Sequence, residues 1–409
     1  MMYKKSFFIV SFLLIYGMID MFAGEIRPDE IIPYRTVNGK NLDLHVFYPQ
    51  GKRTSGHDRT AIIHFFGGGW MGGTPEQFYQ QCKYLSSYGC VAISADYRVM
   101  KESGVTPYHC VDDARHAISF IRKKSAYFGI SPEKIVASGG SAGGHVALCT
   151  AVFSDNEDTL SVPDALVLYN PVLDTSENGY GKNKFKGDEI SLSPNHNFKK
   201  GLPPVLLFHG TQDHTVPFAN AVAFDDKMRN LNNDCSFIPV WGKDHGFFNA
   251  SYFRKSNGDS IFFFCMSKVL AFLSNHSFLQ DDVKINECKI PVYCNLDAYG
   301  ARSEYLPLFQ KKLGDNYHVF SCDVSEIEET GTCSPTVVIA GIDKDDEYKM
   351  LKTLSGKVVK PTVFLYDKKT ESKKLFGLEI RTVGVLKENS NVADITDYVY
   401  DRVYNNLIK

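Results

Sequence analysis

The chain has 409 residues, of which 44% are hydrophobic and 22% are charged, so it is long enough for more than one ordinary domain. Its formal net charge of −2 gives no general attraction to nucleic acid, and no run of lysine and arginine suited to binding phosphates is present. The composition therefore predicts a folded globular protein without nucleic-acid partners.

The first residues have the pattern of an export signal. Lys4 and Lys5 precede an apolar run over residues 7–16, and small residues follow near Ala23. This run is shorter than the roughly 20 apolar residues that a membrane-spanning helix needs. We therefore expect residues 1–24 to be a signal peptide and the protein to be exported, periplasmic or extracellular. An uncleaved membrane anchor is the alternative.

Apolar strand patterns alternate with helical patterns from residue 25 to residue 276. This alternation predicts an α/β fold with a mostly parallel sheet and helices on both faces. The expected strands cover residues 41–49, 60–66, 90–98, 134–140, 164–172, 203–210 and 235–242. The expected helices cover residues 75–89, 112–129, 145–153 and 218–232.

A glycine triplet follows the strand expected at residues 60–66. Three consecutive glycines let bare backbone approach a substrate closely. Backbone N–H groups in such a loop can stabilise the oxyanion of a tetrahedral intermediate. We expect Gly68 and Gly69 to supply these donors, with Gly67 as a further candidate.

The segment IVASGGSAGGHVAL, residues 135–148, contains a G-x-S-x-G motif around Ser141. Glycines on both sides of the serine remove the Cβ clashes that forbid a sharp turn from a strand into a helix. The motif predicts that Ser141 is a nucleophile and that the amide of Ala142 is another oxyanion donor. The alternative is a glycine-rich turn with an idle serine.

A nucleophilic serine needs an imidazole to take its proton and a carboxylate to orient that imidazole. Asp213 and His245 each follow an expected strand, and the carboxyl ends of parallel strands meet at one edge of a sheet. We therefore expect the triad Ser141, Asp213 and His245, with Asp174 as the alternative acid. His209, near Asp213, is expected to be a core or loop histidine.

Three side chains beside these motifs are candidate substrate contacts. His145 follows Ser141 by one helical turn, and Trp70 and Trp241 stand next to the glycine loop and the expected catalytic histidine. A flat aromatic side chain near the cleft would suit a sugar or an aryl group. Packing in the core is the alternative for each of the three.

Residues 175–201 are polar, contain glycines and have no apolar period. They enter between two expected strands on the catalytic side, so we expect a cap or lid insertion, with a solvated loop as the alternative. The shortage of bulky hydrophobic residues argues against the greasy lid of a lipase. Tyr180, Phe185 and His196 are its candidate substrate contacts.

Residues 281–409 contain strand patterns at 289–295, 317–324, 336–342 and 360–367, with helical patterns between them. They predict a second, smaller α/β domain of unknown role. The whole chain has ten cysteines, and this even number allows disulfides in an exported protein while leaving their pairing open. No set of cysteines and histidines has zinc-like spacing, so no metal is expected.

The glycine loop, the serine motif, Asp213 and His245 together resemble α/β-hydrolases of the hormone-sensitive-lipase and acetyl-esterase type over about residues 27–276. That family has an H-G-G-G loop, a G-x-S-x-G turn, an Asp and a His in this order. Phe66 stands at the family's histidine position, a departure that affects the hydrogen-bonding support of the loop but not its amides.

The resemblance implies a serine carboxylic-ester hydrolase that works through an acyl-enzyme and needs no cofactor. Loops of the F-G-G-G-W type resemble those of bacterial esterases that act on acylated carbohydrates. A small-molecule or glycan ester, acetyl first, is therefore the expected substrate. The alternatives are a serine peptidase of prolyl-oligopeptidase type and an idle hydrolase fold used for binding. The oligomeric state stays open.

Overall fold

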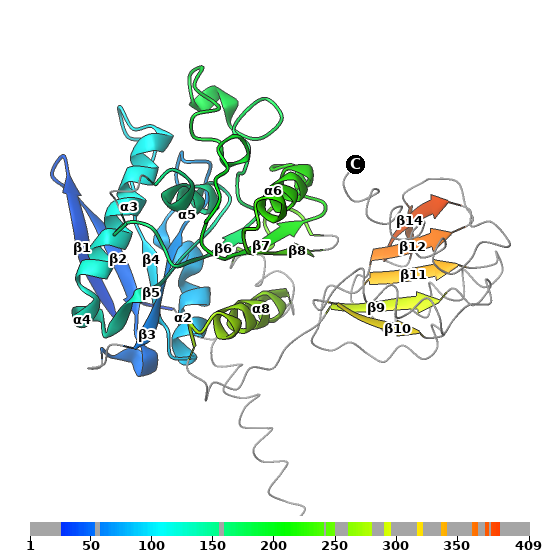
Figure 1. The fold of residues 1–409 in the computed structure, drawn as a ribbon, viewed down its shortest axis with the longest axis horizontal. Coiled ribbons are helices and arrows are strands. Elements are labelled where there is room, and N and C mark those ends of the chain that lie inside the picture. The colour runs from blue at the N-terminus through cyan, green and yellow to red at the C-terminus, as the bar shows by residue number, and fades with distance from the viewer. Residues whose placement is uncertain are drawn as a thin grey trace, which may run out of the picture.

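The computed structural model describes residues 26–53, 58–154, 159–240, 243–249 and 261–279, together with six strands further along the chain. The first five ranges build an α/β unit around an eight-stranded sheet with the order β1-β2-β4-β3-β5-β6-β7-β8 (Figure 1). The expected signal peptide lies outside the described residues. Within the described residues, no helix is long and apolar enough to cross a membrane.

The eight-stranded sheet is mostly parallel. The strands β1 (Glu30–Val37) and β2 (Lys40–Phe47) form an antiparallel hairpin, and β2 is also antiparallel to β4. All other neighbours in this sheet are parallel, which brings the carboxyl ends of six strands to one edge. These six are β3 (Arg59–Phe65), β4 (Val91–Ala95), β5 (Ile130–Gly140), β6 (Ala165–Tyr169), β7 (Val205–Gly210) and β8 (Cys235–Val240).

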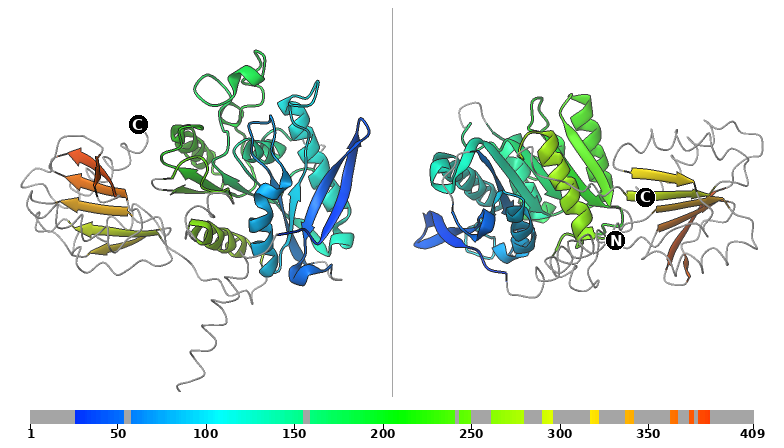
Figure 2. Two further views of the ribbon diagram at one scale, coloured as in Figure 1. Left: turned by 180° about the vertical axis from the view of Figure 1, so that it is seen from behind. Right: turned by 90° about the horizontal axis from the view of Figure 1, so that it is seen from below.

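Helices cover both faces of this sheet (Figures 1 and 2). On one face α2 contacts α8, and on the other α3 contacts α5. Every residue of α5 is buried, as expected for a helix that follows a buried strand into the centre of the molecule. The helices are α2 (Tyr79–Ser87), α3 (Pro107–Lys123), α4 (Ser125–Phe128), α5 (Ala142–Val152), α6 (Phe218–Asn230) and α8 (Ile261–Asn275).

Three details of the helices and strands differ from the sequence-based prediction. The helix expected at residues 112–129 begins five residues earlier, because Thr106 and His109 form a capping box around Pro107. It is also divided at Lys124 into α3 and α4. The edge strand β1 was not predicted, since its residues alternate between exposed and half-buried and include little of the core.

A second sheet of six strands follows in sequence, with the order β10-β9-β11-β12-β14-β13. The strands expected at residues 289–295, 317–324, 336–342 and 360–367 correspond to the first four in chain order. The helical patterns between them lie outside the described residues, so the second α/β domain stays a prediction. The strands are β9 (Ile290–Asn295), β10 (Tyr317–Ser321), β11 (Val337–Gly341), β12 (Thr362–Tyr366), β13 (Lys373–Leu375) and β14 (Leu378–Gly384).

Six described cysteines lie in the α/β unit. Most are buried, and none is joined to another described cysteine; they are Cys82, Cys90, Cys110, Cys149, Cys235 and Cys265. The buried ones among them pack as small apolar side chains, and the pairing of the ten cysteines as a whole stays open.

Candidate active site

Ser141 occupies a strained turn between β5 and α5. Its φ of 55° and ψ of −123° lie where a residue with a side chain is rarely found. Glycine lets the turn close, because a Cβ at Gly143 would lie only 2.1 Å from the carbonyl oxygen of Phe65 at the end of β3. The turn therefore holds the serine hydroxyl at the carboxyl edge of the sheet, as the G-x-S-x-G motif predicts.

The structure brings Ser141, His245 and Asp213 together in one hydrogen-bonded row. His245 Nε2 lies 2.8 Å from Ser141 Oγ, and His245 Nδ1 lies 2.7 Å from Asp213 Oδ2. Asp213 follows β7 and His245 follows β8, so the three side chains come from three loops at the same edge. This arrangement can move a proton from the hydroxyl to an imidazole that the carboxylate orients.

The environment of Asp213 keeps its carboxyl group ionised. Oδ1 accepts the backbone N–H groups of Thr215 and Val216, each at 2.8 Å. Burial raises the pKa of Asp213, but hydrogen bonds from His209 and His245 outweigh burial and hold this pKa below its usual value. The carboxylate therefore accepts the Nδ1 proton of His245, which leaves Nε2 free to accept the proton of Ser141.

His209 is a second histidine at the triad acid. It is fully buried, its Nε2 lies 3.1 Å from the carbonyl oxygen of Val216, and the same nitrogen lies 3.4 Å from Asp213 Oδ2. The expected position in the core is present, whereas the contact with Asp213 was not predicted. The spacing of four residues between His209 and Asp213 was the signal available in the sequence.

Asp174 is not the triad acid. Its Oδ1 accepts the backbone N–H of Ser176 and lies 3.8 Å from Nδ1 of His196. Because Asp213 already binds His245, the alternative assignment of Asp174 is wrong.

The glycine loop leaves two amides free for an oxyanion. Gly68 and Gly69 have positive φ values of 135° and 59°, and their amides donate to no acceptor among the described residues. The amide of Ala142, at the start of α5, has no partner within the helix. The Gly67 amide is different, because it donates to Oε1 of Gln77. Gly67 is therefore not an oxyanion donor, and Gly68, Gly69 and Ala142 remain.

Side chains support this loop in place of the histidine that Phe66 replaces. The ring of Phe66 stacks on Tyr97 with 4.2 Å between centroids, and the Tyr97 hydroxyl donates to the carbonyl oxygen of Phe66 at 2.6 Å. The Lys184 ammonium donates to the carbonyl oxygen of Gly69 at 2.9 Å. Together with Gln77, these contacts bind three polar backbone groups of the loop: the carbonyl oxygens of Phe66 and Gly69 and the amide of Gly67.

Residues 175–201, called the cover segment, pack part of their length against the core and expose the rest, and their role as a cap or lid stays a prediction. They include the short 3-10 helices η4 (Lys182–Lys184) and η5 (Pro194–His196) and rise beyond the carboxyl edge of the sheet (Figure 1). Phe185 is buried against Trp70, with 5.5 Å between ring centroids. The contact of Lys184 with Gly69 places this segment directly beside the oxyanion loop.

Trp70 and His145 belong to the core beneath this cover. Both are fully buried, and their rings meet edge to face at 5.0 Å. His145 Nε2 donates to the carbonyl oxygen of Leu192 at 2.8 Å, and burial lowers the pKa of His145 to about 4. The expected substrate contacts at Trp70 and His145 are therefore corrected to packing. Trp241 lies outside the described residues.

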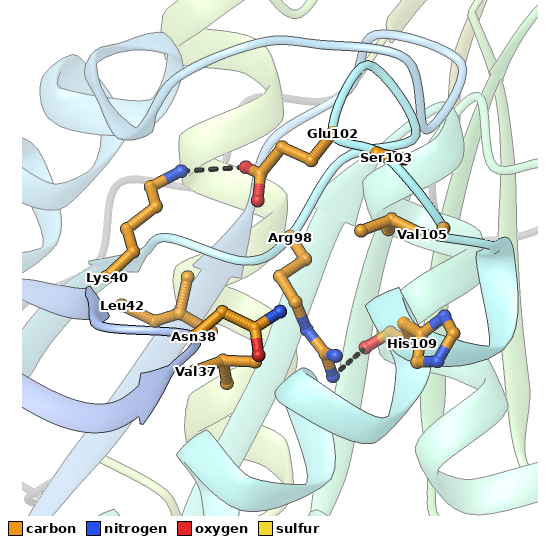
Figure 3. Close-up of a pocket in the computed structure, with 10 residues that line it drawn as sticks. Val37, Asn38, Lys40, Leu42, Arg98, Glu102, Ser103, Val105 and His109 are labelled. Atoms are coloured by element: carbon orange, nitrogen blue, oxygen red, sulfur yellow. Dashed lines mark hydrogen bonds and ion pairs between the residues drawn. The ribbon is translucent and has the colours of Figure 1, made fainter.

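A pocket of about 320 Å³ lies apart from the triad, between the β1–β2 turn and the loop after β4 (Figure 3). Its rim carries an ion pair between Lys40 and Glu102 at 2.7 Å. The guanidinium of Arg98 points toward the carbonyl oxygen of His109 and is paired with Asp113. No triad residue lines this pocket, so it is not the catalytic cleft.

The site defines a serine hydrolase of the α/β-hydrolase fold. Its serine lies in a strained turn, its imidazole is oriented by a buried carboxylate, and free backbone amides lie in the glycine loop. A family model described as BD-FAE matches residues 44–190. The apo structure of Thermogutta terrifontis esterase 2 is 36% identical, with a TM-score of 0.56, and the match covers 64% of this chain and 99% of that one. The chain belongs to the carboxylesterases of the α/β-hydrolase fold.

Curated relatives are esterases of several kinds. An acetylxylan esterase of Xylanibacter ruminicola is 26% identical over 208 residues, which are 47% of this chain and 42% of that protein. A probable isoprenylcysteine alpha-carbonyl methylesterase of Arabidopsis thaliana is 25% identical over 270 residues, 58% of this chain and 55% of that protein. The chain thus spans about half the length of these curated relatives.

Proposed function

We propose that this protein hydrolyses short-chain acyl esters, acetyl esters first, carried on a sugar or polysaccharide. The observation that carries the proposal is the bridge made by His245, which lies 2.8 Å from Ser141 Oγ and 2.7 Å from Asp213 Oδ2. Two free glycine amides and that of Ala142 stand beside this bridge as oxyanion donors.

The reaction follows from these positions. Ser141 Oγ attacks the ester carbonyl while His245 Nε2 takes its proton, and the amides of Gly68, Gly69 and Ala142 bind the oxyanion. The imidazolium then gives its proton to the leaving alcohol, and the acyl group stays on Ser141. Water, deprotonated by His245, attacks this acyl-enzyme in the same way and releases the acid and the free serine.

Two observations support a short acyl group on a carbohydrate. Thermogutta terrifontis esterase 2 has been solved with butyrate and with propionate bound, and one curated relative is an acetylxylan esterase. In this chain the cover segment brings the Lys184 ammonium and the Tyr180 hydroxyl within 3.3 Å of each other at Gly69. Such polar groups suit a hydroxyl-rich alcohol better than a lipid.

The test measures p-nitrophenol release from esters of increasing chain length and acetate release from acetylated xylan. Ser141→Ala serves as the matched control. We expect turnover with short chains, acetate release from the glycan, and loss of both in the variant. Turnover of simple esters without acetate release would contradict the carbohydrate substrate alone. Equal inactivity of both proteins on every ester would contradict the esterase.

We also propose that residues 1–24 direct export. The support is the pair Lys4 and Lys5 followed by the apolar run over residues 7–16. Mass spectrometry of the protein recovered from its native cells tests this proposal. A mature N-terminus near Ala23, outside the cytoplasm, is the expected result, and an intact N-terminus in the cytoplasm would contradict it.

A further inference from the structure

Gln77 contacts both the oxyanion loop and the loop of the catalytic histidine. It lies in η3 (Pro75–Phe78), a short 3-10 helix directly before α2. Its Oε1 accepts the backbone N–H of Gly67, and its Nε2 donates to Oδ1 of Asn249 at 2.7 Å. Nδ2 of Asn249 donates in turn to the carbonyl oxygen of Gly246 at 3.2 Å.

The direction of these three hydrogen bonds is determined by chemistry. A backbone N–H can only donate, so the Gln77 side chain must present its oxygen to Gly67 and its nitrogen to Asn249. Asn249 must then present its oxygen to Gln77 and its nitrogen to the Gly246 carbonyl. The amide orientations are therefore mutually consistent along the whole row.

The two ends of this row are adjacent to the groups that do the chemistry. Gly67 directly precedes the oxyanion donors, and a Cβ on it would lie 3.2 Å from Cβ of Ser141. Gly246 directly follows His245. The row thus links the backbone that holds the oxyanion donors to the backbone that holds the general base.

We propose that Gln77 is a positioning residue for the ester hydrolysis, and that it acts through Asn249 to set the oxyanion loop against the His245 loop. This inference rests on the proposed function. Among the described residues, the Gln77 side chain makes its hydrogen bonds to Gly67 and Asn249 and not to the triad or the oxyanion donors, so its effect is on their spacing. Displacements of about 1 Å in such a constellation can reduce turnover by about 100-fold.

Other contacts keep the His245 loop in place when Gln77 is changed. Asn170 Nδ2 donates to the carbonyl oxygen of His245 at 2.7 Å, and Gln81 Nε2 donates to that of Phe248 at 2.9 Å. A variant of Gln77 is therefore expected to fold with its triad formed. What it loses is the link between that loop and the glycine loop.

The experiment compares Gln77→Met, Asn249→Ala and the double variant with the wild type. It measures kcat and KM for p-nitrophenyl acetate, the thermal midpoint, and the affinity for phenylboronic acid. The boronic acid bonds to Ser141 and places an oxygen in the oxyanion hole. In Gln77→Met we expect kcat to fall by about 10- to 100-fold and boronate affinity to fall with it, while KM changes by less than about threefold.

The double variant separates positioning from simple loss of packing. Because Gln77 and Asn249 act in one row, we expect the double variant to lose no more than about twofold beyond the worse single variant. Gln77→Glu keeps an acceptor for Gly67 but replaces the donor to Asn249 by an acceptor and adds a negative charge beside the oxyanion loop, so its kcat should fall by at least as much as that of Asn249→Ala. Gln80→Met is the control, since the Gln80 amide nitrogen has no partner among the described residues.

Two results would overturn the proposal. One is a folded Gln77→Met variant with kcat and boronate affinity within twofold of the wild type, and the other is fully additive losses in the double variant. If Gln77→Met does not fold, Gln77→Glu and Asn249→Ala decide by the same criteria. If the wild type cleaves no ester, the proposed function fails, and boronate affinity alone still decides whether Gln77 positions the loop.

Discussion

The ring of Phe248 packs directly against the α-carbon of Gly140, the residue before the nucleophile. A Cβ at Gly140 would lie 2.1 Å from a ring carbon of Phe248. The same ring meets the imidazole of His245 edge to face, with 6.1 Å between centroids. The absence of a side chain at Gly140 therefore lets the His245 loop pack closely, and it also permits the sharp turn at Ser141.

Gly140→Ala is expected to lose both stability and activity. The added methyl group must displace Phe248, and overpacking of this kind costs about 1–3 kcal/mol of unfolding free energy. Because Phe248 supports His245, we expect kcat for p-nitrophenyl acetate to fall by at least about tenfold. Urea denaturation and steady-state kinetics measure the two effects.

Gly72→Ala is the matched control for that variant, since a Cβ there meets no atom within 4 Å. We expect its unfolding free energy to change by less than about 0.5 kcal/mol. A Gly140→Ala protein as stable as Gly72→Ala would contradict the contact with Phe248.

The two histidines at Asp213 are expected to differ in importance. His245→Gln removes the general base, and kcat should fall by about 10⁴- to 10⁶-fold. His209→Gln retains a donor for the carbonyl oxygen of Val216 and removes only a 3.4 Å contact with Asp213, so kcat should fall by less than about tenfold. Steady-state kinetics of the two variants are the measurement, and equal losses would assign His209 a direct part in catalysis.

Tyr97→Phe tests the support of the oxyanion loop. The variant removes the hydroxyl that donates to the buried carbonyl oxygen of Phe66 and leaves that oxygen without this partner. Loss of such a bond costs about 1–3 kcal/mol of unfolding free energy, and the loosened loop should lower kcat. KM is expected to change little. A variant with unchanged kcat and stability would show that ring stacking alone holds the loop.

His145 should contribute a loss of stability in weak acid, opposite in sign to the contribution of Asp96, whose pKa burial raises to about 6. Burial lowers the pKa of the His145 side chain from 6.5 to about 4, so below pH 6.5 the unfolded chain binds a proton there that the folded chain does not. The contribution of His145 to the free energy of unfolding therefore falls as the pH falls from 6.5 toward 4, by up to about 3 kcal/mol.

Denaturation in urea between pH 4.5 and 7.5 measures this dependence, and His145→Gln is the variant for comparison. Its glutamine can still donate to the carbonyl oxygen of Leu192 but does not titrate. We expect the slope of unfolding free energy against pH to be smaller in the variant, by up to about 1.4 kcal/mol per pH unit, which corresponds to one proton. Burial also lowers the pKa of His64, to about 3, so His64 still contributes to the pH dependence of unfolding free energy in the variant. An identical slope in both proteins would contradict the assignment.

The motifs that could be found in the sequence are those whose backbone conformation requires particular residues within one short segment. The turn at Ser141 and the open loop at Gly68 and Gly69 need glycine wherever they occur, so short segments identify them. Asp213 and His245 could be named because parallel strands bring their carboxyl ends to one edge, whatever the loops between them contain.

Roles that depend on contacts between distant segments became visible in the three-dimensional fold. Gln77 and Asn249 are 172 positions apart, and nothing in either neighbourhood shows that their amides meet. The same applies to Trp70 and His145, which stand beside the motifs in sequence but lie beneath the cover segment in space. Local backbone geometry made the catalytic motifs recognisable in the amino-acid sequence, whereas long-range packing selects the neighbours that support them.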